Sequence, residues 1–361
     1  MKEKRNYTID FLKIIATTFI VFHHFQQVTN TQFERFNFNN GNLYFGYLVE
    51  FFFIISGYLM ALSNERKTRT NTEDFILKIE RLFPMILIVN TVCLIAAGIY
   101  KTCLGEWWLG FPHGIWNLFL SFSLLFQGGP FGDQMGLNNP TWYVCVLLEC
   151  YILYYVTCKL FHKQRFIRFV SYCFIVLLAA GMYTYNVNFP FFTQQSTRGY
   201  TAFFIGVMLY YVIQYFPKKA IHIPSLLLML TIVISYFTCP ELIDNQWAIA
   251  TFLFFPSAFV FCMSNSTIQK LLSFFPFFES GGKASFHVYL WHTPIFLIGD
   301  LVIRLCNVNM EYTAGTMLLT ALCLWCWGLI SYYLIEKPVS KAIASKHETI
   351  MSWINRLNKQ P

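Results

Sequence analysis

The sequence predicts an all-α integral membrane protein, a bundle of about ten transmembrane helices. Of its 361 residues, 56% are hydrophobic and only 12% are charged, whereas charged residues make up about a quarter of a typical soluble domain. Apolar runs of about 20 residues recur, each long enough to cross a bilayer as a helix. Short charged segments separate these runs, and the alternating pattern of membrane barrel strands is missing.

The apolar runs define the expected spans. Because hydrocarbon offers the backbone no hydrogen-bond partner, each run should form a helix. The basic residues Lys2, Lys4 and Arg5 precede the first run, and no small-residue cleavage site follows it, so we expect a retained span rather than a signal peptide. The expected spans are residues 11–28, 43–63, 82–100, 142–161, 166–186, 199–216, 223–238, 247–264, 284–305 and 313–335.

Charges between the spans predict the orientation. With the N-terminus in the cytoplasm, the outer segments hold only the basic residues Arg35, Lys101, Arg198 and Arg304, and the other loop lysines and arginines lie inside. This asymmetry follows the positive-inside rule, and it accounts for the net charge of +8 without binding to nucleic acid. We therefore expect a multi-pass protein of the cytoplasmic (inner) membrane with both termini in the cytoplasm.

The same rule bears on a short apolar stretch, residues 115–127. If it crossed the membrane, every later loop would change side and the charge asymmetry would fail. We therefore expect a re-entrant or interfacial helix in the outer loop. No loop is long enough to bury a core of its own, so we expect one transmembrane domain over residues 1–340 and a cytoplasmic tail over residues 341–361.

Polar side chains in the first span are functional candidates, because polar groups are costly to place in a membrane. Lys13 and His24 are 11 residues apart, about three helical turns, so they share a face with roughly 17 Å of rise between them. Asp10 lies near Lys13, while His23 points about 100° away from His24. Histidine can take a hydroxyl proton near neutral pH, which suits a general base. An interfacial histidine near a helix end is the structural alternative.

Two further motifs each have a functional and a structural interpretation. Lys78 and Arg81 are three residues apart at the cytoplasmic edge, where they could clamp the phosphates of an anionic cofactor or anchor lipid headgroups. Ser56 could line a polar interior, or Ser56 and Gly57 could simply allow close helix packing.

The fourth, ninth and last spans carry polar residues and prolines. Trp142 and Glu149 lie in the fourth span and His292 in the ninth. Pro294 should kink the ninth helix and free carbonyl groups near His292, and Pro338 should limit the last helix. The 11 cysteines lie mostly in apolar runs as small packing residues, and we expect no metal site.

Four segments in order along the chain resemble motifs of the membrane-bound acyltransferase family 3, which acylates hydroxyl groups of glycans and related molecules. The resemblance covers about residues 5–340. Each segment alone is a weak signal, so the resemblance depends on all four segments occurring together in this order. The segments are Asp10-x-x-Lys13 with His24 eleven residues after the lysine, Phe52-Phe53-Ile54-Ile55-Ser56-Gly57-Tyr58, Ser285-Phe286-His287-Val288-Tyr289-Leu290-Trp291-His292, and Ile335-Glu336-Lys337-Pro338.

The resemblance implies an O-acyltransferase that moves an acyl group, expected to be acetyl, from cytoplasmic acyl-CoA to a hydroxyl of a surface or lipid-linked polysaccharide. His24 matches the family's catalytic histidine and would act as a base or through a covalent acyl-histidine. Lys13, Lys78 and Arg81 would bind the co-substrate acetyl-CoA. The candidates for lining the pore or the substrate site are Asp10, Ser56, Trp142, Glu149 and His292.

Two positions depart from the family's pattern. Lys78 stands where the family has the first arginine of an R-x-x-R pair, and lysine lacks the bidentate geometry of a guanidinium group. Leu147 occupies the place of the family's fourth-span glutamate, and Glu149 follows two residues later. A transporter or flippase of a lipid-linked glycan, without acyl transfer, is the alternative function. The expected partners are the glycan acceptor, acyl-CoA, membrane lipid and proteins of polysaccharide assembly.

Overall fold

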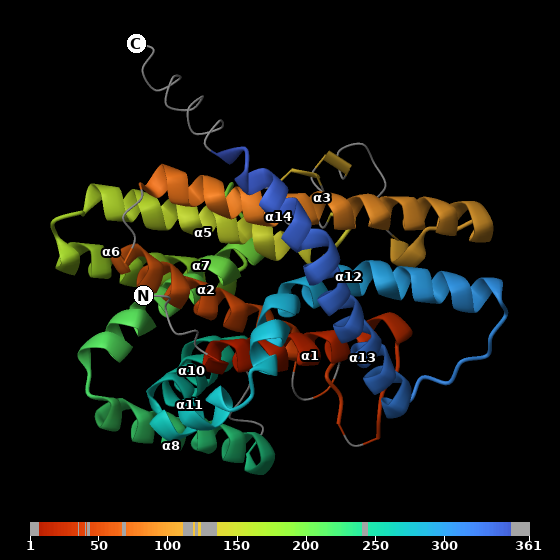
Figure 1. Ribbon diagram of the computed structural model, residues 1–361. Helices are drawn as coiled ribbons and strands as arrows, with labels where there is room; N and C mark the ends of the chain where they lie inside the picture. Colours follow the sequence, from red (N-terminus) through yellow and green to blue (C-terminus); the bar gives the residue numbers. More distant parts are fainter. Residues whose placement is uncertain are drawn as a thin grey trace.

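The structure is a computed structural model that describes residues 7–34, 36–39, 41, 44–66, 70–110, 118–119, 122–123, 136–239 and 245–347. Helices pack side by side in one bundle (Figure 1). The long helices are α1 (Tyr7–Thr29), α2 (Leu48–Arg66), α3 (Asn71–Leu104), α5 (Thr141–Leu160), α6 (Arg165–Thr184), α7 (Gln194–Tyr215), α8 (Lys218–Thr238), α12 (Phe277–Leu305) and α13 (Ala314–Ser331). The shorter elements are η1 (Phe45–Tyr47), η2 (Trp108–Gly110), α9 (Gln246–Ala248), η4 (Ile249–Phe254), α10 (Phe255–Ser264), α11 (Ser266–Ser273), η5 (Tyr332–Glu336) and α14 (Lys337–Ala344).

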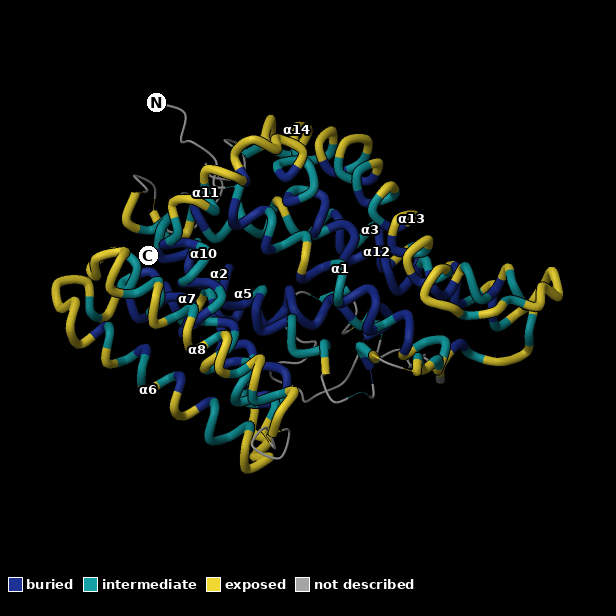
Figure 2. Tube along the Cα trace, turned by 90° about the horizontal axis from the view of Figure 1, so that it is seen from below, coloured by how far each residue is buried: buried dark blue, intermediate teal, exposed yellow. Residues whose placement is uncertain are grey.

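Nine helical stretches of the described chain are long and apolar enough to cross a bilayer, which confirms the all-α membrane bundle. The other expected span, residues 199–216, is helix α7, which has 22 residues. Most residues of α7 from Gln195 to Val207 are buried, so its polar side chains face other helices rather than lipid. No residue of α8 is buried, so α8 lies at the rim of the bundle. Figure 2 shows the buried positions gathered at the centre.

Helix α3 begins earlier than the predicted span of residues 82–100. The side chain of Thr70 caps it by accepting a hydrogen bond from the Glu73 backbone N–H at 3.2 Å, a usual way to satisfy a free helical N–H. Lys78 and Arg81 therefore lie within the helix and not in a loop before it. At 34 residues the helix is about 51 Å long, so its ends extend beyond the hydrocarbon core.

Helices α2 and α7 cross in close contact at two glycines. A Cβ atom on Gly57 would lie 1.9 Å from the carbonyl oxygen of Phe203, and a Cβ on Gly206 would lie 2.0 Å from that of Ile54. Only residues without a side chain allow the two backbones to approach this closely. The prediction that Gly57 serves close helix packing is therefore confirmed.

Pro294 frees a backbone carbonyl near His292, as predicted. Proline has no N–H to donate to the residue four positions earlier, which is Leu290. The side-chain amide of Asn138 donates to the Leu290 oxygen instead, at 3.1 Å. The segment that precedes α5 is thereby joined to the middle of α12, close to His292.

The prediction that Pro338 limits the last helix is wrong. Helix α13 continues through the π-helical turn η5 into α14, which ends at Ala344. The π turn shifts the hydrogen-bond pattern, and Pro338 stands directly after that shift, in the first turn of α14. The expected tail begins inside this helix. Its residues from 348 onward, and most of the stretch 115–127, lie outside the described residues.

Candidate functional site

Two histidines from different helices stack on each other inside the bundle. His24 comes from the last turns of α1, and His292 comes from the middle of α12. Their ring centroids are 4.7 Å apart and their planes differ by 20°. His292 is buried, while His24 is half-buried. Two of the predicted site residues are therefore in direct contact, and we call them the histidine pair.

Hydrogen bonds set the proton positions on both rings. His292 Nδ1 lies 2.6 Å from the carbonyl oxygen of Tyr289, which can only accept, so Nδ1 carries the hydrogen. His24 Nδ1 donates to the side-chain oxygen of Gln27 at 2.8 Å. No hydrogen bond to a described residue involves Nε2 of either ring. Each Nε2 therefore keeps a lone pair, as the removal of a hydroxyl proton requires.

His23 has a different environment from His24. Its Nδ1 donates to the carbonyl oxygen of Phe38 at 2.9 Å, and its ring meets the Tyr44 ring edge-on at 4.7 Å. Only 1% of the residue is exposed. The side chain of His23 therefore ties the segment after α1 to the helix, and helical spacing directs it away from the stacking contact with His292.

A cavity of about 590 Å³ is lined by positions earlier along α1 and α12 than the histidine pair. Its described walls include five basic side chains and no acidic one; the basic residues are Lys13, Arg66, Lys78, Arg81 and Lys283. We call it the basic cavity. The three residues predicted to bind the cofactor thus line one space, although they come from two helices. Charges of one sign on low-dielectric walls attract an anionic ligand.

Carboxylates hold the two cations of the Lys78-x-x-Arg81 motif. Lys78 Nζ lies 3.4 Å from Asp74 Oδ2, and that carboxylate also accepts from the hydroxyl of Tyr155 at 2.5 Å. Arg81 Nε lies 3.8 Å from Glu336 Oε1, and the Arg81 side chain is 69% exposed. Most of its guanidinium group therefore stays open to a ligand.

A second cavity of about 550 Å³ adjoins the basic cavity and shares Lys13 and Arg81 with it. We call it the vestibule. Asp10 and Glu336 lie in its wall. Asp10 is only 3% exposed, because it packs against α12, where a Cβ on Gly282 would lie 2.2 Å from Asp10 Oδ1. Asp10 therefore stands at the α1–α12 contact, at the same end of the bundle as the cations.

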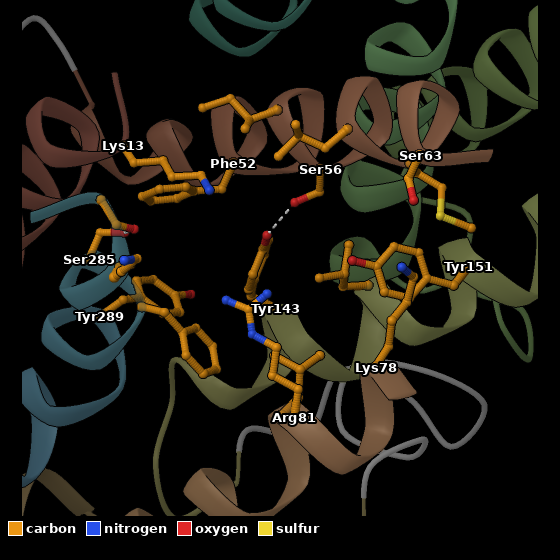
Figure 3. A pocket seen from close by; sticks show the side chains of 18 of the residues that line it. Lys13, Phe52, Ser56, Ser63, Lys78, Arg81, Tyr143, Tyr151, Ser285 and Tyr289 are labelled. Atoms are coloured by element: carbon orange, nitrogen blue, oxygen red, sulfur yellow. Dashed lines mark hydrogen bonds between the residues drawn. The ribbon is translucent and has the colours of Figure 1, made fainter. Parts of the chain in front are cut away.

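Ser56, Tyr143 and Tyr289 contribute hydroxyl and aromatic groups to the wall of the basic cavity (Figure 3). Ser56 Oγ and the Tyr143 hydroxyl form a hydrogen bond of 2.9 Å. Tyr289 lines the same cavity, and its ring centroid lies 5.6 Å from that of Tyr143 and 5.8 Å from that of His292. The cavity wall therefore reaches the histidine pair through one ring.

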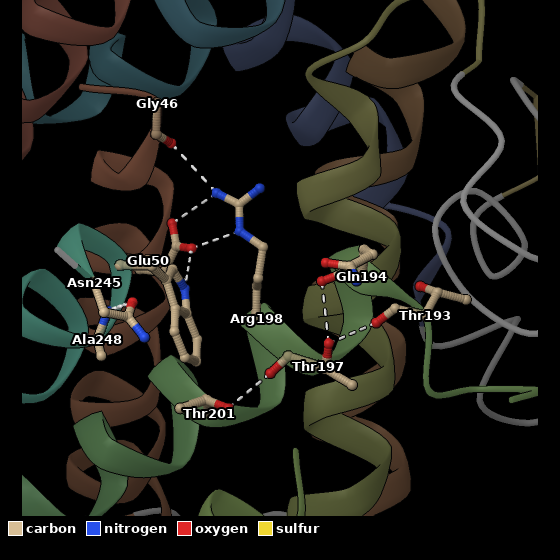
Figure 4. A network of polar contacts seen from close by, with 10 residues as sticks. Gly46, Glu50, Thr193, Gln194, Thr197, Arg198, Thr201, Asn245 and Ala248 are labelled. Carbon is tan, nitrogen blue, oxygen red and sulfur yellow. Dashed lines mark hydrogen bonds and ion pairs between the residues drawn. The ribbon is translucent and has the colours of Figure 1, made fainter. Parts of the chain in front are cut away.

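Trp142 and Glu149 lie on α5, and neither is in the described wall of the basic cavity. The Arg198 guanidinium lies over the Trp142 ring, 5.3 Å from its centroid. Arg198 also pairs with the buried Glu50, with 2.6 Å between Nε and Oε1 (Figure 4). Glu149 accepts a hydrogen bond from the Tyr200 hydroxyl at 2.7 Å. The side chains of Trp142 and Glu149 therefore belong to contacts that join α5 to α7.

Several residues of the cavity wall were not identified from the sequence, among them Arg66, Lys283, Tyr143 and Tyr289. Arg66 and Lys283 resemble the other basic residues of the segments expected on the cytoplasmic side, which follow the positive-inside rule without any site. Lys283 does stand two positions before the segment 285–292, and that proximity is the one signal that could have identified it.

Comparison with known proteins supports one family. The sequence model of a family described as "Acyltransferase domain" matches residues 6–332, which is most of the chain. No curated protein and no solved structure gives a significant match. The matched range contains the histidine pair and all the basic residues of the cavity. The chain therefore belongs to the membrane-bound acyltransferase family 3, and it is a multi-pass membrane acyltransferase that transfers groups other than amino-acyl groups.

Proposed function

We propose that the protein transfers an acetyl group from cytoplasmic acetyl-CoA to a hydroxyl of a lipid-linked or surface glycan. The observation that carries this proposal is that the wall of the basic cavity contacts the histidine pair through Tyr289. Five cations line the cavity, and one ring, Tyr289, joins its wall to His292. An anionic donor held at the cations would point its other end toward the histidines.

The basic cavity is the proposed site for the nucleotide end of the donor. The phosphates of coenzyme A suit a cluster of cations, and Arg81 can bind two phosphate oxygens at once. Lys13 and Lys78 would act as point charges. The positive-inside rule predicts that these residues lie on the cytoplasmic side, where acyl-CoA is found. The thioester arm would then extend toward Tyr143 and Tyr289.

His24 is the proposed general base. Its Nε2 would take the acceptor's hydroxyl proton while the hydroxyl oxygen attacks the thioester carbonyl carbon. A carbon–oxygen bond forms, the carbon–sulfur bond breaks, and the coenzyme A thiolate leaves with the proton from His24. The hydrogen bond to Gln27 and the stacking on His292 support this role, because they hold the ring with its lone pair at Nε2. A covalent acyl-histidine at Nε2 would use the same tautomer.

Two measurements test the proposal. Purified wild-type protein should bind acetyl-CoA saturably and more weakly as salt rises, whereas a flippase needs no acyl-CoA. Mass analysis of surface glycans should then show O-acetyl groups in cells with the wild-type protein and none in cells with His24→Ala at equal protein levels. Absence of acetyl-CoA binding would favour the flippase. Retained O-acetylation in the His24→Ala cells would exclude His24 as the base.

A further inference from the structure

The last two of the four sequence motifs meet in a buried network of hydrogen bonds. His287 belongs to the third motif and lies on α12, and Glu336 belongs to the fourth and ends the π turn η5. The two side chains are joined by a hydrogen bond from His287 Nε2 to Glu336 Oε2. His287 Nδ1 lies 2.8 Å from Ser331 Oγ, and the indole N–H of Trp291 donates to the same oxygen at 2.9 Å. We call these four residues the imidazole network.

The hydrogens of the imidazole network follow one direction. A carboxylate oxygen only accepts, so Nε2 of His287 carries a hydrogen. With one hydrogen on the ring, Nδ1 accepts from the Ser331 hydroxyl, whose oxygen accepts from Trp291, because an indole nitrogen only donates. Both nitrogens of His287 are therefore bonded, and the residue is fully buried. The network fixes one oxygen of Glu336 and leaves the other for a further partner.

The π turn η5 explains how Ser331 and Glu336 reach the same ring. Residues five positions apart in a regular α-helix point about 140° apart. The hydrogen bonds of a π turn join residues five apart and so bring them closer to one face. Such turns inside α-helices are frequent at functional sites. Here the turn places the Glu336 carboxylate between α12 and α3.

The second oxygen of Glu336 extends the network to Arg81 on α3, since Oε1 lies 3.8 Å from Arg81 Nε. Arg81 lies in the described walls of both the basic cavity and the vestibule, whereas Glu336 lies in that of the vestibule alone. The carboxylate therefore approaches Nε from the vestibule. In Figure 3 the guanidinium group of Arg81 extends into the basic cavity. Its two terminal nitrogens, which suit a phosphate, are then left for the space proposed for the donor.

We infer that Glu336 is a positioning residue for the donor: held by the imidazole network, it orients the Arg81 side chain so that both terminal nitrogens face a phosphate of acyl-CoA. The inference rests on the proposed function, which makes Arg81 a phosphate ligand. The Arg81 side chain is 69% exposed, and ordering such a side chain opposes binding. A carboxylate that restricts it before the donor arrives reduces that cost.

The charge of Glu336 by itself would have the opposite effect. A carboxylate close to a phosphate site repels the ligand and offsets part of the positive charge that attracts it. If charge alone mattered, removal of the carboxylate would strengthen donor binding. A positioning role requires weaker binding, so the sign of the change distinguishes the two effects.

The test is a double-variant cycle on the purified full-length protein, with acetyl-CoA as the probe and calorimetry as the binding measurement. Glu336→Gln keeps the shape of the side chain and removes its charge. The dissociation constant for acetyl-CoA should rise about two- to fivefold, while kcat at saturating acetyl-CoA stays within about twofold of wild type. In Arg81→Ala protein the same substitution should not change the dissociation constant further. The matched control is Glu80→Gln, because Glu80 also lies in the vestibule wall but pairs with His347 at 3.0 Å; its binding should equal that of wild type.

Unchanged or tighter binding by Glu336→Gln would overturn the inference, as would an equal weakening in the Arg81→Ala background, because Glu336 would then act without Arg81. If Arg81→Ala protein binds acetyl-CoA as wild type does, the proposed donor site is wrong as well. If Arg81→Ala weakens binding and Glu336→Gln does not, the donor site stands and only the inference fails. Should Glu336→Gln not fold, Ser331→Ala takes its place, because it releases Nδ1 of His287. Weaker binding that disappears in the Arg81→Ala background would support the inference, and unchanged binding would contradict it.

Discussion

The basic cavity and the apolar groove, a third cavity of about 370 Å³, differ in the chemistry of their walls, although both border α1. Five cations line the first, whereas the second is walled by aliphatic and aromatic side chains with one amide. Lys13 contributes to the first cavity and its neighbour Leu12 to the second. One helix can therefore separate an ionic ligand from a hydrocarbon one, because consecutive residues point about 100° apart.

The comparison extends to the adjacent histidines at the end of α1. The His24 ring stacks on His292, and no hydrogen bond to a described residue involves its Nε2. The His23 ring is buried against Tyr44 and bonded to a carbonyl oxygen. Their different surroundings therefore predict different consequences of the same substitution.

His24→Ala should have the largest effect. Removing a positioned general base costs about 10²- to 10⁴-fold in rate, so kcat for acetyl transfer should fall by that range. The affinity for acetyl-CoA should change little, because His24 is not in the described wall of the basic cavity, the proposed site for the donor's phosphates. Measuring kcat and acetyl-CoA binding on one preparation separates an effect on catalysis from an effect on donor binding. A parallel loss of both would place His24 in donor binding instead of chemistry.

Arg81→Ala should come second. A hydrogen bond to a charged group contributes about 1.5–3 kcal/mol, so the KM for acetyl-CoA should rise about 10- to 100-fold. Arg81→Lys keeps the charge but loses the bidentate geometry, and its effect should be smaller. Lys337→Ala is the control, since Lys337 is an exposed cation of the same region that lies in neither cavity wall. An equal rise in KM for the control would show that the cations of the cavity act only as nonspecific positive surface charge.

Ser56→Ala and Tyr143→Phe should have smaller effects that do not add. Each removes the same hydrogen bond across the basic cavity, worth about 0.5–1.5 kcal/mol. Each single variant should therefore change kcat/KM by less than about tenfold. The double variant should match the single ones, because residues that share one interaction are not independent. Fully additive changes would show that the two hydroxyl groups act separately.

His23→Ala should have the smallest effect on transfer. It removes a hydrogen bond to the Phe38 carbonyl, which should lower the free energy of unfolding by about 1 kcal/mol. Its kcat should stay within about threefold of wild type, because a substitution that removes a separate hydrogen bond acts nearly independently of the catalytic residue. Thermal unfolding and kcat measured together test this. A loss of kcat as large as that of His24→Ala would abolish the distinction between the two residues.

Much of the fold could be predicted from the sequence because the bilayer imposes it. The apolar runs, the role of Gly57 and the freed carbonyl beside His292 follow from hydrogen bonding and packing rules. The continuation of the last helix past Pro338 could not be predicted, because it depends on the π turn Tyr332–Glu336. A local shift of hydrogen bonding of this kind leaves no periodic signal.

The candidate site was only partly predictable for a related reason. Lys13 and His24 share a helix, so spacing alone places them on one face. The stacking of His24 on His292, the joining of Ser56 to Tyr143, and the pairing of Arg198 with Glu50 connect distant parts of the chain. Such contacts depend on how helices pack, and one sequence does not specify the order of helices in a bundle.

The most direct test of the account is a sided transfer measurement in proteoliposomes. The protein would carry a C-terminal tag that reports its orientation by protease accessibility, and acetyl-CoA would be supplied on one side only. A polyprenyl phosphate-linked glycan from cells that contain this protein would be present in the bilayer. The account predicts acetylation of the glycan only when acetyl-CoA is on the side of the tag, because the basic cavity opens there. Equal acetylation with acetyl-CoA on either side would contradict it.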